Sequence, residues 1–356
     1  MFDRFILQQN RLYLNKLDIN AIRIFRFAFA VTLSVLLAFG LGWPLSIILP
    51  VFTIVFLKAP APCPSFKVSL SIIVMTMAYL LAGFMISLVF VRYPLVMLVI
   101  NSLLIFLIFY RSLKSENMLA TLFALIGVLV IPLMMQTSQN MAMLVMTGLI
   151  FAVTAALLLV WLAFTVFPDP DLTHSETHSE KMPELTLPVL TQQQQVNLAW
   201  QKTLMVLPVL ILFFTFNLSG QLLTLIFIAL LAMSPGLSEG ISAGKFMIIG
   251  NTLGGLYAMM FYELLVMVPM FGFFISLTLL VSLLLAKQIF QGNAVSSALH
   301  GSAATTLFLL IGTGTMPFGG DEVDDKFYIR IFLVILATLY IVFAFALING
   351  FRRDRD

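Results

Sequence analysis

The sequence predicts an all-α integral membrane protein with about 12 transmembrane helices, in two parallel six-helix repeats behind an N-terminal interfacial helix. Composition is the first reason, because 61% of the 356 residues are hydrophobic and 10% are charged, whereas a globular chain has about 45–50% and about 25%. Mean hydropathy, at +1.07, is the second. The third is a series of apolar runs that Pro, Gly and charged residues interrupt. Spans and short loops leave no room for a sizeable soluble domain.

Residues 1–23 are predicted to form an amphipathic helix that lies on the membrane surface. Apolar side chains recur there at helical spacing among four basic residues, Arg4, Arg11, Lys16 and Arg23. The segment is too polar to be the apolar core of a signal peptide, and no small-residue cleavage site precedes the first span.

Residues 24–167 are predicted to form the first six-helix membrane half, and residues 197–356 the second. Residues 168–196 contain prolines, acids, two histidines and a glutamine run, which cannot bury a core and predict a cytoplasmic linker. The predicted spans of the first half lie near 25–42, 44–58, 68–90, 94–110, 117–135 and 140–167. Those of the second half lie near 198–216, 220–233, 245–266, 268–287, 294–313 and 327–350.

Charged residues mark equivalent positions in the two halves. Arg26 and Lys202 open the first helices and are 176 positions apart, and Lys67 and Lys245 start the third helices 178 positions apart. Both of these lysines follow a proline-bearing loop. Because each half has an even number of spans, the halves are predicted to be parallel repeats, related by an axis along the membrane normal.

The basic residues predict the orientation. With the N-terminus inside, the inside segments hold 16 of the 19 Lys and Arg residues, and only Arg92, Lys326 and Arg330 lie outside. An excess of Lys and Arg marks the cytoplasmic side of a membrane protein. Both termini are therefore predicted to be cytoplasmic.

The helix predicted over 245–266 carries ionisable residues in an apolar stretch. Lys245 and Glu263 fall on one face at 100° per residue, and Gly250 and Gly254 fall almost opposite. Intramembrane charges are costly and therefore indicate a functional helix. The alternative is that the glycines only pack against a neighbouring helix and that the charges snorkel to the headgroups.

Lys58, Lys67 and Lys245 are predicted to contact an anionic substrate. All three lie at predicted cytoplasmic helix ends beside proline-rich breaks, where unpaired backbone amides also attract an anion. Positive-inside anchoring explains the same lysines without a substrate. Asn101 and Asn251 lie within spans and are candidate contacts to the same substrate, although hydrogen bonds between helices are the commoner role of such residues.

Glu263 and His300 are the candidate proton-coupling residues. His300 lies among small residues in a predicted span, and it is either a proton-relay group or a hydrogen-bonded histidine between helices. Glu263 has no acidic counterpart in the first half, where Met85 takes the equivalent place. If protons move, the second half is therefore predicted to move them.

Other motifs carry less weight. The stretch GISAGKF at 240–246 is one residue short of a phosphate-binding loop and lacks the Ser or Thr that would hold magnesium, so nothing indicates ATP hydrolysis. The acids at 321–325 indicate a solvated loop more than a cation site, and His174 and His178 lie in the proline-flanked linker. The single cysteine excludes an intramolecular disulfide. No metal, cofactor or nucleic-acid partner is predicted.

Stretches from both halves carry a family resemblance. The surface helix is followed by RIFRFAFAVTLSVLLAFGLGWPLSIILPVFTIVFL, a proline-rich turn and a lysine, and the second half contains KTLMVLPVLILFF, LLAMSP and GKFMIIGNTLGGLYA. This pattern resembles the fusaric acid resistance and aromatic acid exporter family. The residues that match the motif-bearing positions of that family are Lys67, Lys245, Gly250, Gly254 and Gly255.

The resemblance implies an efflux component of the bacterial inner membrane for aromatic carboxylic acids or related small anions, usually beside a periplasmic membrane-fusion adaptor. Larger members carry a sizeable cytoplasmic domain where this chain has only the linker at 168–196, which leaves substrate and regulation open. The leading hypothesis is an exporter and not an enzyme. Its partners would be a small organic anion, the adaptor and the lipid bilayer, with homo-oligomerisation left open.

Two alternatives to an exporter are open. One is a membrane-embedded enzyme that acts on a lipid-linked diphosphate through the acidic residues at 321–325. The other is a scaffold subunit that docks an adaptor without moving solute itself.

Overall fold

The computed structural model of the protein describes residues 2–42, 45, 47–59, 61–114, 118–169, 191–216, 225, 237–314, 332, 336, 339–340 and 343–344. Side chains are described at these positions except in 2–18, 118, 237–248 and 313–314. The predicted spans near 220–233 and 327–350 therefore lie almost wholly outside the described residues, and so do the acids at 321–325 and both linker histidines.

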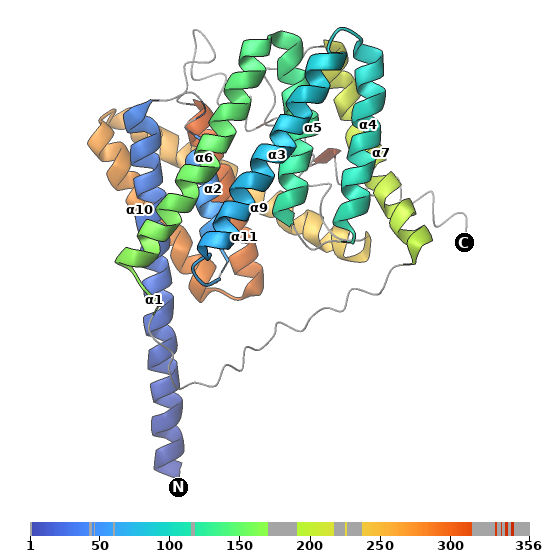
Figure 1. Cartoon of the computed structure of the whole chain (residues 1–356). Coiled ribbons are helices and arrows are strands. Elements are labelled where there is room, and N and C mark those ends of the chain that lie inside the picture. The colour runs from blue at the N-terminus through green and yellow to red at the C-terminus, as the bar shows by residue number, and fades with distance from the viewer. Residues whose placement is uncertain are drawn as a thin grey trace. The chain divides into compact units, whose positions relative to one another are not determined.

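Helices make up nearly all of the described chain, and Figure 1 labels them in order. The first six are α1 (Phe2–Leu41), α2 (Ile48–Leu57), α3 (Phe66–Phe90), α4 (Pro94–Ser112), α5 (Met118–Thr137) and α6 (Gln139–Val166). The later ones are α7 (Gln192–Phe216), α9 (Leu237–Met267), α10 (Phe271–Gln291) and α11 (Ala294–Gly314). Every predicted span of the first half overlaps one of these helices.

Eight helical segments among the described residues are long and apolar enough to cross a membrane, and they lie in α1, α3 to α7, α10 and α11. The protein is therefore an all-α, multi-pass integral membrane protein, which confirms the predicted fold class. The total of about 12 spans stays a prediction.

α1 is one continuous helix of 40 residues, so it includes both the predicted interfacial segment and the first predicted span. At about 1.5 Å per residue it is about 60 Å long, roughly twice the thickness of a hydrocarbon core. Its apolar part is Ile19–Leu41. The helix ends at Gly42, whose φ of +60° is the left-handed conformation that closes a helix end without a steric penalty for a Cβ.

α2 has only ten residues, about half of the number that a membrane span needs. The span predicted near 44–58 is therefore shorter in the structure. Leu45, in the connection before α2, has a φ of +64°, a conformation that is unfavourable for a residue with a Cβ. α2 buries a face that includes Leu49, Phe52 and Ile54, so it is a packed short helix.

The chain divides into two compact units, and each takes helices from both predicted halves. The first unit comprises Met1–Phe66, Phe151–Leu172 and Ile249–Ile331. The second unit comprises Lys67–Ile150, Thr173–Ile248 and Phe332–Asp356. The units thus do not coincide with the predicted sequence halves at 24–167 and 197–356.

Four helices of the first unit form a closed ring, in which α1 packs against α10, α10 against α11, α11 against α2 and α2 against α1. Two aromatic pairs join α1 to α10. The rings of Phe27 and Phe290 are 6.0 Å apart, and those of Phe39 and Phe274 are 5.1 Å apart. Because the residue numbers rise on one helix and fall on the other, α1 and α10 are antiparallel.

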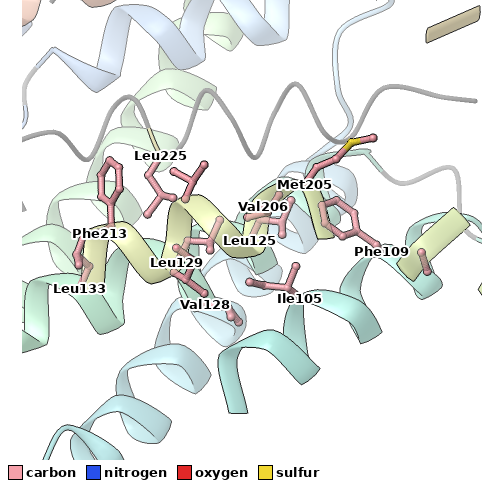
Figure 2. Close-up of a cluster of buried hydrophobic side chains, with 13 residues drawn as sticks. Ile105, Phe109, Leu125, Val128, Leu129, Leu133, Met205, Val206, Phe213 and Leu225 are labelled. Atoms are coloured by element: carbon pink, nitrogen blue, oxygen red, sulfur yellow. The ribbon is translucent and has the colours of Figure 1, made fainter. Parts of the chain in front are cut away.

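The second unit packs α4 against α7 and against α5, and α5 also contacts α7. Figure 2 shows the core between these helices. Its members are buried apolar side chains with β-branched, leucine and aromatic residues interleaved, among them Ile105, Phe109, Leu125, Leu129, Val206, Leu210 and Phe213.

The two units contain similar helix pairs. In two six-helix repeats, α1 corresponds to α7, α4 to α10 and α5 to α11. The pairs α1 with α10 and α7 with α4 are then equivalent, and so are α10 with α11 and α4 with α5. Each unit thus pairs the first helix of one predicted half with the fourth helix of the other, and that fourth helix also packs against the fifth helix of its own half. For this reason each unit contains helices from both predicted halves.

Candidate functional site

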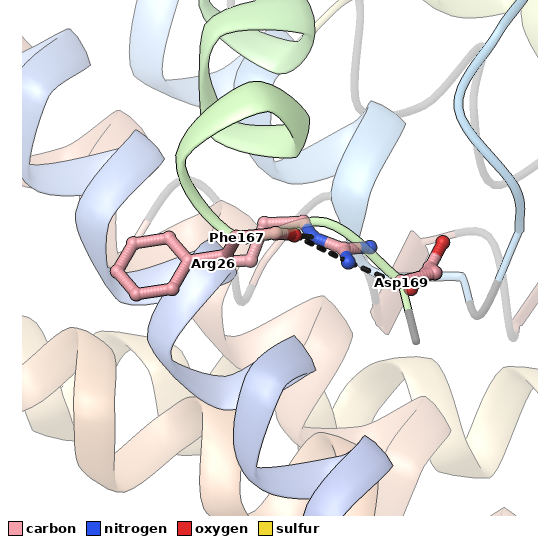
Figure 3. A network of polar contacts seen from close by, with 3 residues as sticks. All are labelled: Arg26, Phe167 and Asp169. Carbon is pink, nitrogen blue, oxygen red and sulfur yellow. Dashed lines mark hydrogen bonds and ion pairs between the residues drawn. The ribbon is translucent and has the colours of Figure 1, made fainter. Parts of the chain in front are cut away.

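The side chain of Arg26, on α1, is buried in the first unit, and only 4% of its surface is exposed. Its Nε and Nη2 atoms donate hydrogen bonds of 2.9 and 2.7 Å to the carbonyl oxygen of Phe167, and Nη2 also donates to Oδ1 of Asp169 at 2.6 Å (Figure 3). The guanidinium carbon lies 3.8 Å from the centroid of the Phe164 ring. The end of α6 and the residues after it therefore hold this cation.

The position of Arg26 follows from the chemistry of a helix end. Phe167 comes directly after Val166, the last residue of α6. Carbonyl groups at a helix C-terminus lack N–H partners within the helix and form the negative end of its dipole, so a guanidinium is favourable there. A cation in an apolar helix is costly unless its donors are satisfied. These contacts explain how the apolar part of α1 accommodates Arg26.

Trp161, near the end of α6, holds the proline-rich segment at 61–65 between α2 and α3. Its indole Nε1 donates a hydrogen bond of 3.0 Å to the carbonyl oxygen of Pro64, and its ring centroid lies 5.9 Å from that of Phe66. Prolines have no backbone N–H, so this segment cannot form regular backbone hydrogen bonds throughout. The indole satisfies one of its carbonyls and is itself fixed in orientation.

An open cavity of about 500 Å³, the Trp161 cavity, lies beside this segment. A crevice of about 20 Å³ shares two lining residues with it, Pro64 and Phe164, and reaches Arg23 and Arg26. The crevice has room for about one water molecule. The cavity therefore lies next to the buried guanidinium, and its lining residues are Cys63, Pro64, Trp161, Phe164, Thr165, Pro168 and Asp169.

Cys63 is the only cysteine of the chain, and its side chain is exposed at the cavity. Burial of the thiol raises its pKa, the charge of Arg26 lowers it and the charge of Asp169 raises it. The pKa of the Cys63 thiol therefore depends on the charges of both members of the ion pair.

The arrangement suits a small molecule with an apolar or aromatic body and an anionic end. The volume falls within the range of about 300–1,000 Å³ that is usual for ligand pockets. Trp161 and Phe164 offer aromatic surface, and Arg26 offers N–H donors in the fork geometry that carboxylates prefer. The part of the chain that the structure describes has no group of three or more His, Cys, Asp or Glu that could hold a metal ion.

Two predicted site residues of the first unit, Lys58 and His300, are associated with α11. The half-buried Lys58 packs its stem on α11, where its Cδ would lie 3.8 Å from a Cβ at Gly301. Nδ1 of His300 lies 2.8 Å from the carbonyl oxygen of Ser296 on its own helix. In the tautomer with a proton on Nδ1, the ring donates this bond to the carbonyl, and Oγ of Ser296 lies 3.2 Å from the same nitrogen. Substrate contact by Lys58 and proton coupling by His300 stay predictions.

Asn251 of α9 bonds to α11 through its side chain. Its Oδ1 accepts hydrogen bonds from the hydroxyls of Ser302, at 3.2 Å, and Thr306, at 2.9 Å, and 3% of the residue is exposed. This is the helix-to-helix role that the sequence left open as the commoner one. A contact of Asn251 with substrate is not tested by these bonds.

The other predicted charges belong to α3 and α9. Lys67, at the start of α3, is exposed in the second unit, and Glu263 of α9 is exposed in the first. Lys245 lies on α9, but its side chain is outside the described residues. The predicted pairing of Lys67 with Lys245 at an anion site therefore stays a prediction.

Asn101 of α4 is 1% exposed, and neither its Oδ1 nor its Nδ2 has a hydrogen-bond partner among the described residues. Thr278, 177 positions later on α10, is fully buried, and its hydroxyl also lacks one within the described chain. In the predicted repeat, α4 and α10 are the fourth helices of the two halves, so these buried polar groups would be equivalent.

Two of the glycines with a predicted packing role, Gly250 and Gly254, lie close to α11. A Cβ on Gly250 would lie 3.0 Å from Cβ of Ser302, and one on Gly254 would lie 2.7 Å from the carbonyl oxygen of Ala303. Both glycines thus allow α9 to approach α11 closely. Gly255 is buried as well.

A second close contact of the same kind joins the third and fifth helices of the first half. A Cβ on Gly83 of α3 would collide with the carbonyl oxygen of Gly127 on α5. In both halves, therefore, small residues let the third helix meet the fifth.

A protein family model matches the first part of the chain. Residues 23–165 match a protein family described as "Protein of unknown function (DUF2955)". No curated protein and no solved structure matches the chain. The matched stretch runs from the apolar part of α1 to the end of α6, so it contains Arg26, Cys63, Trp161 and Phe164, and it stops before Asp169.

The sequence interpretation did not select the residues of the Trp161 cavity. It used Arg26 only as a marker of the repeat, although an arginine inside a predicted span is a functional candidate by the same argument that selected Lys245. Asp169 was assigned to the linker at 168–196, and the structure instead bonds it to Arg26, 143 positions away. A charge in the first span and the first acid after the sixth span were the available signals.

Proposed function

We propose that the protein is the membrane component of an efflux system for small organic anions, in particular aromatic carboxylic acids, in the bacterial inner membrane. It would export its substrate from the cytoplasm and work beside a periplasmic membrane-fusion adaptor, as a transporter component and not as an enzyme. The resemblance to the fusaric acid resistance and aromatic acid exporter family supports this proposal.

The observation that carries the proposal is the Trp161 cavity beside the buried Arg26. A guanidinium that is held next to an aromatic-lined cavity supplies the two features that an aromatic carboxylate needs, a cation for the carboxylate and apolar surface for the ring. Positive-inside counting predicts that the proline-rich segment, and with it the cavity, faces the cytoplasm. An exporter loads its substrate from that side.

Export of a radiolabelled hydroxybenzoate tests the proposal. Cells that express the protein are preloaded, and loss of the label is followed after dilution. Wild type is expected to release the label several-fold faster than cells with an empty vector. Arg26→Ala is expected to lose most of that difference at an equal amount of protein in the membrane.

Arg92→Ala is the matched control, because it removes the same charge from an exposed turn between α3 and α4. It is expected to export like wild type. Equal release by wild type and empty vector, in cells that also express the cognate adaptor, would overturn the proposed function. Equal release by wild type and Arg26→Ala would remove the observation that carries it.

The proposed orientation has its own test, because Cys63 is the only thiol. A membrane-impermeant maleimide is expected to label Cys63 in inside-out membrane vesicles and not in intact cells whose outer membrane has been permeabilised. Labelling only from the periplasmic side would reverse the proposed topology and with it the direction of loading.

A further inference from the structure

We propose that Asp169 is an internal stand-in for the carboxylate of the substrate, and that a planar aromatic monocarboxylate takes its place on Arg26 with its ring against Trp161 and Phe164. The inference rests on the proposed function and names the binding site within it. It assigns specific roles to four residues: Arg26 binds the carboxylate, Trp161 and Phe164 contact the ring, and Asp169 competes with the ligand.

The bonds of Arg26 divide into a fixed set and an exchangeable one. Phe167 accepts from two nitrogens, and the Phe164 ring stacks on the guanidinium, so both hold the group in place. Asp169 accepts through a single oxygen, and 44% of its side chain is exposed. An exposed carboxylate with one bond is the partner that another carboxylate can replace.

Arg26 also has unused donors. A guanidinium has five N–H groups, and the bonds among the described residues use Nε and Nη2 only. Nη1 donates to no oxygen in the described part of the chain. A substrate carboxylate that binds through two oxygens would use this capacity, and bidentate pairs are stronger and more directional than single bonds. The exchange therefore favours the ligand over Asp169.

The walls of the Trp161 cavity fit an aromatic ring. The hydrogen bond to Pro64 fixes the indole edge, which leaves the ring of Trp161 as a rigid surface at the cavity. Phe164 lines both the cavity and the crevice that reaches Arg26, so a ligand that contacts Phe164 lies close to the guanidinium. Offset or edge contacts between aromatic rings add to the gain from apolar burial.

The competing charge also predicts selectivity. Once displaced, Asp169 remains near the cavity and repels a second negative charge. A monocarboxylate such as benzoate is therefore preferred over a dicarboxylate such as phthalate. Benzylamine has the ring but no carboxylate to accept hydrogen bonds from Arg26, so it is not expected to displace Asp169.

Protection of Cys63 from alkylation tests the site directly. The purified protein is placed in lipid nanodiscs, and the rate of reaction with a fluorescent maleimide is measured with increasing benzoate. Benzoate is expected to slow labelling at least threefold and in a saturable way, because Cys63 lines the same cavity. Phthalate is expected to need at least a tenfold higher concentration, and benzylamine is expected not to protect.

Two variants separate the proposal from a purely structural ion pair. Arg26→Gln is expected to lose protection, whereas Asp169→Asn is expected to reach half-protection at a benzoate concentration at least threefold lower than wild type. If the ion pair were purely structural, both Arg26→Gln and Asp169→Asn would weaken benzoate binding. Arg92→Gln is the charge-matched control and is expected to match wild type. Thr165→Trp fills the cavity from an exposed position on α6 and is expected to lose protection without touching Arg26.

Three results would overturn the inference. These are no protection of wild type by benzoate, weaker protection in Asp169→Asn, and protection by benzylamine at the same concentration. Slower labelling in anionic than in zwitterionic nanodiscs, with no effect of benzoate, would show a lipid headgroup site instead. Export without protection would remove this site and leave the proposed function, whereas protection without export would do the reverse.

Discussion

Arg26 of α1 and Lys202 of α7 are equally buried, each with 4% of its surface exposed, although they lie 176 positions apart and in different units. Each lies beside an aromatic ring of its own unit. The guanidinium carbon of Arg26 is 3.8 Å from the centroid of Phe164, and Nζ of Lys202 is 6.0 Å from that of Phe109. The first helix of each predicted half therefore carries a buried cation at an equivalent position.

Lys202→Met is expected to destabilise the protein less than Lys202→Ala. Both variants remove the charge, but Met keeps most of the length of the Lys side chain, which is buried on α7 near Phe109, and so keeps most of its packing. Lys202→Ala removes the side-chain volume as well and is expected to lower the free energy of unfolding by roughly 2–4 kcal/mol. Thermal unfolding of the detergent-solubilised protein measures both variants. A lower midpoint for Lys202→Met than for Lys202→Ala would contradict this expectation.

Hydropathy predicted several of the described helices closely. The span predicted over 68–90 corresponds to α3 (Phe66–Phe90), and the one over 94–110 corresponds to α4 (Pro94–Ser112). Pro94 lies at the first position of α4, where its missing N–H costs nothing. Such boundaries are encoded locally, by the end of an apolar run and by residues that start or stop a helix.

The candidate site could not be predicted in the same way, because it depends on contacts between distant segments. Arg26 meets Asp169 only because α6 ends beside α1, and no periodicity reports which helix ends meet. The spacing of the lysines near proline-rich breaks predicted an anion site. In the structure, the stem of Lys58 packs on α11, and Lys67 is exposed in the other unit. The sequence repeat located the buried cations Arg26 and Lys202 and did not indicate their partners.

The glycines at helix crossings are expected to tolerate no side chain. Gly83→Ala places a methyl group against the backbone carbonyl of Gly127, and Gly254→Ala places one against that of Ala303. Backbone cannot move aside as a flexible side chain does, so each change is expected to cost about 1–3 kcal/mol. Thermal unfolding in detergent measures the loss.

Gly272→Ala is the control for both, because a Cβ at this position near the start of α10 would have no atom within 4 Å. It is expected to be neutral or to stabilise by up to about 1 kcal/mol through helix propensity. Unfolding midpoints that fall equally in all three variants would show that close packing at the two helix crossings does not account for the loss.

Asn251→Leu and Asn101→Leu are expected to act in opposite directions. Asn251 bonds to two hydroxyls of α11, so its loss is expected to cost about 0.6 kcal/mol, the average for such bonds between membrane helices, and at most about 1.7 kcal/mol. Asn101 is buried without a hydrogen bond in the described chain, so Leu at that position removes an unsatisfied polar group and is expected to be neutral or stabilising.

Thermal unfolding in detergent measures the stability of both variants, and an export assay measures their activity. If Asn101→Leu unfolds at a higher temperature than wild type and loses export, Asn101 is retained for substrate or water and not for stability. If it unfolds at a clearly lower temperature, the expectation from its missing partners is wrong.

Cys63 is expected to report the charges of Arg26 and Asp169 through the pH dependence of its alkylation. Only the thiolate reacts, and burial holds the pKa of the Cys63 thiol above its ordinary value. Alkylation of the folded protein should therefore reach half of its maximal rate at a higher pH than alkylation of the unfolded chain.

Asp169→Asn removes a charge that raises the pKa of the Cys63 thiol, so the profile moves to lower pH and labelling at neutral pH becomes faster. Arg26→Gln removes a charge that lowers the pKa, so the profile moves to higher pH. Both shifts are small, because Cys63 is exposed and salt screens the charges, so low ionic strength is the condition of choice. In denaturant the three proteins should give one profile. Shifts in the same direction for both variants would show that Cys63 responds to a change of packing and not to the two charges.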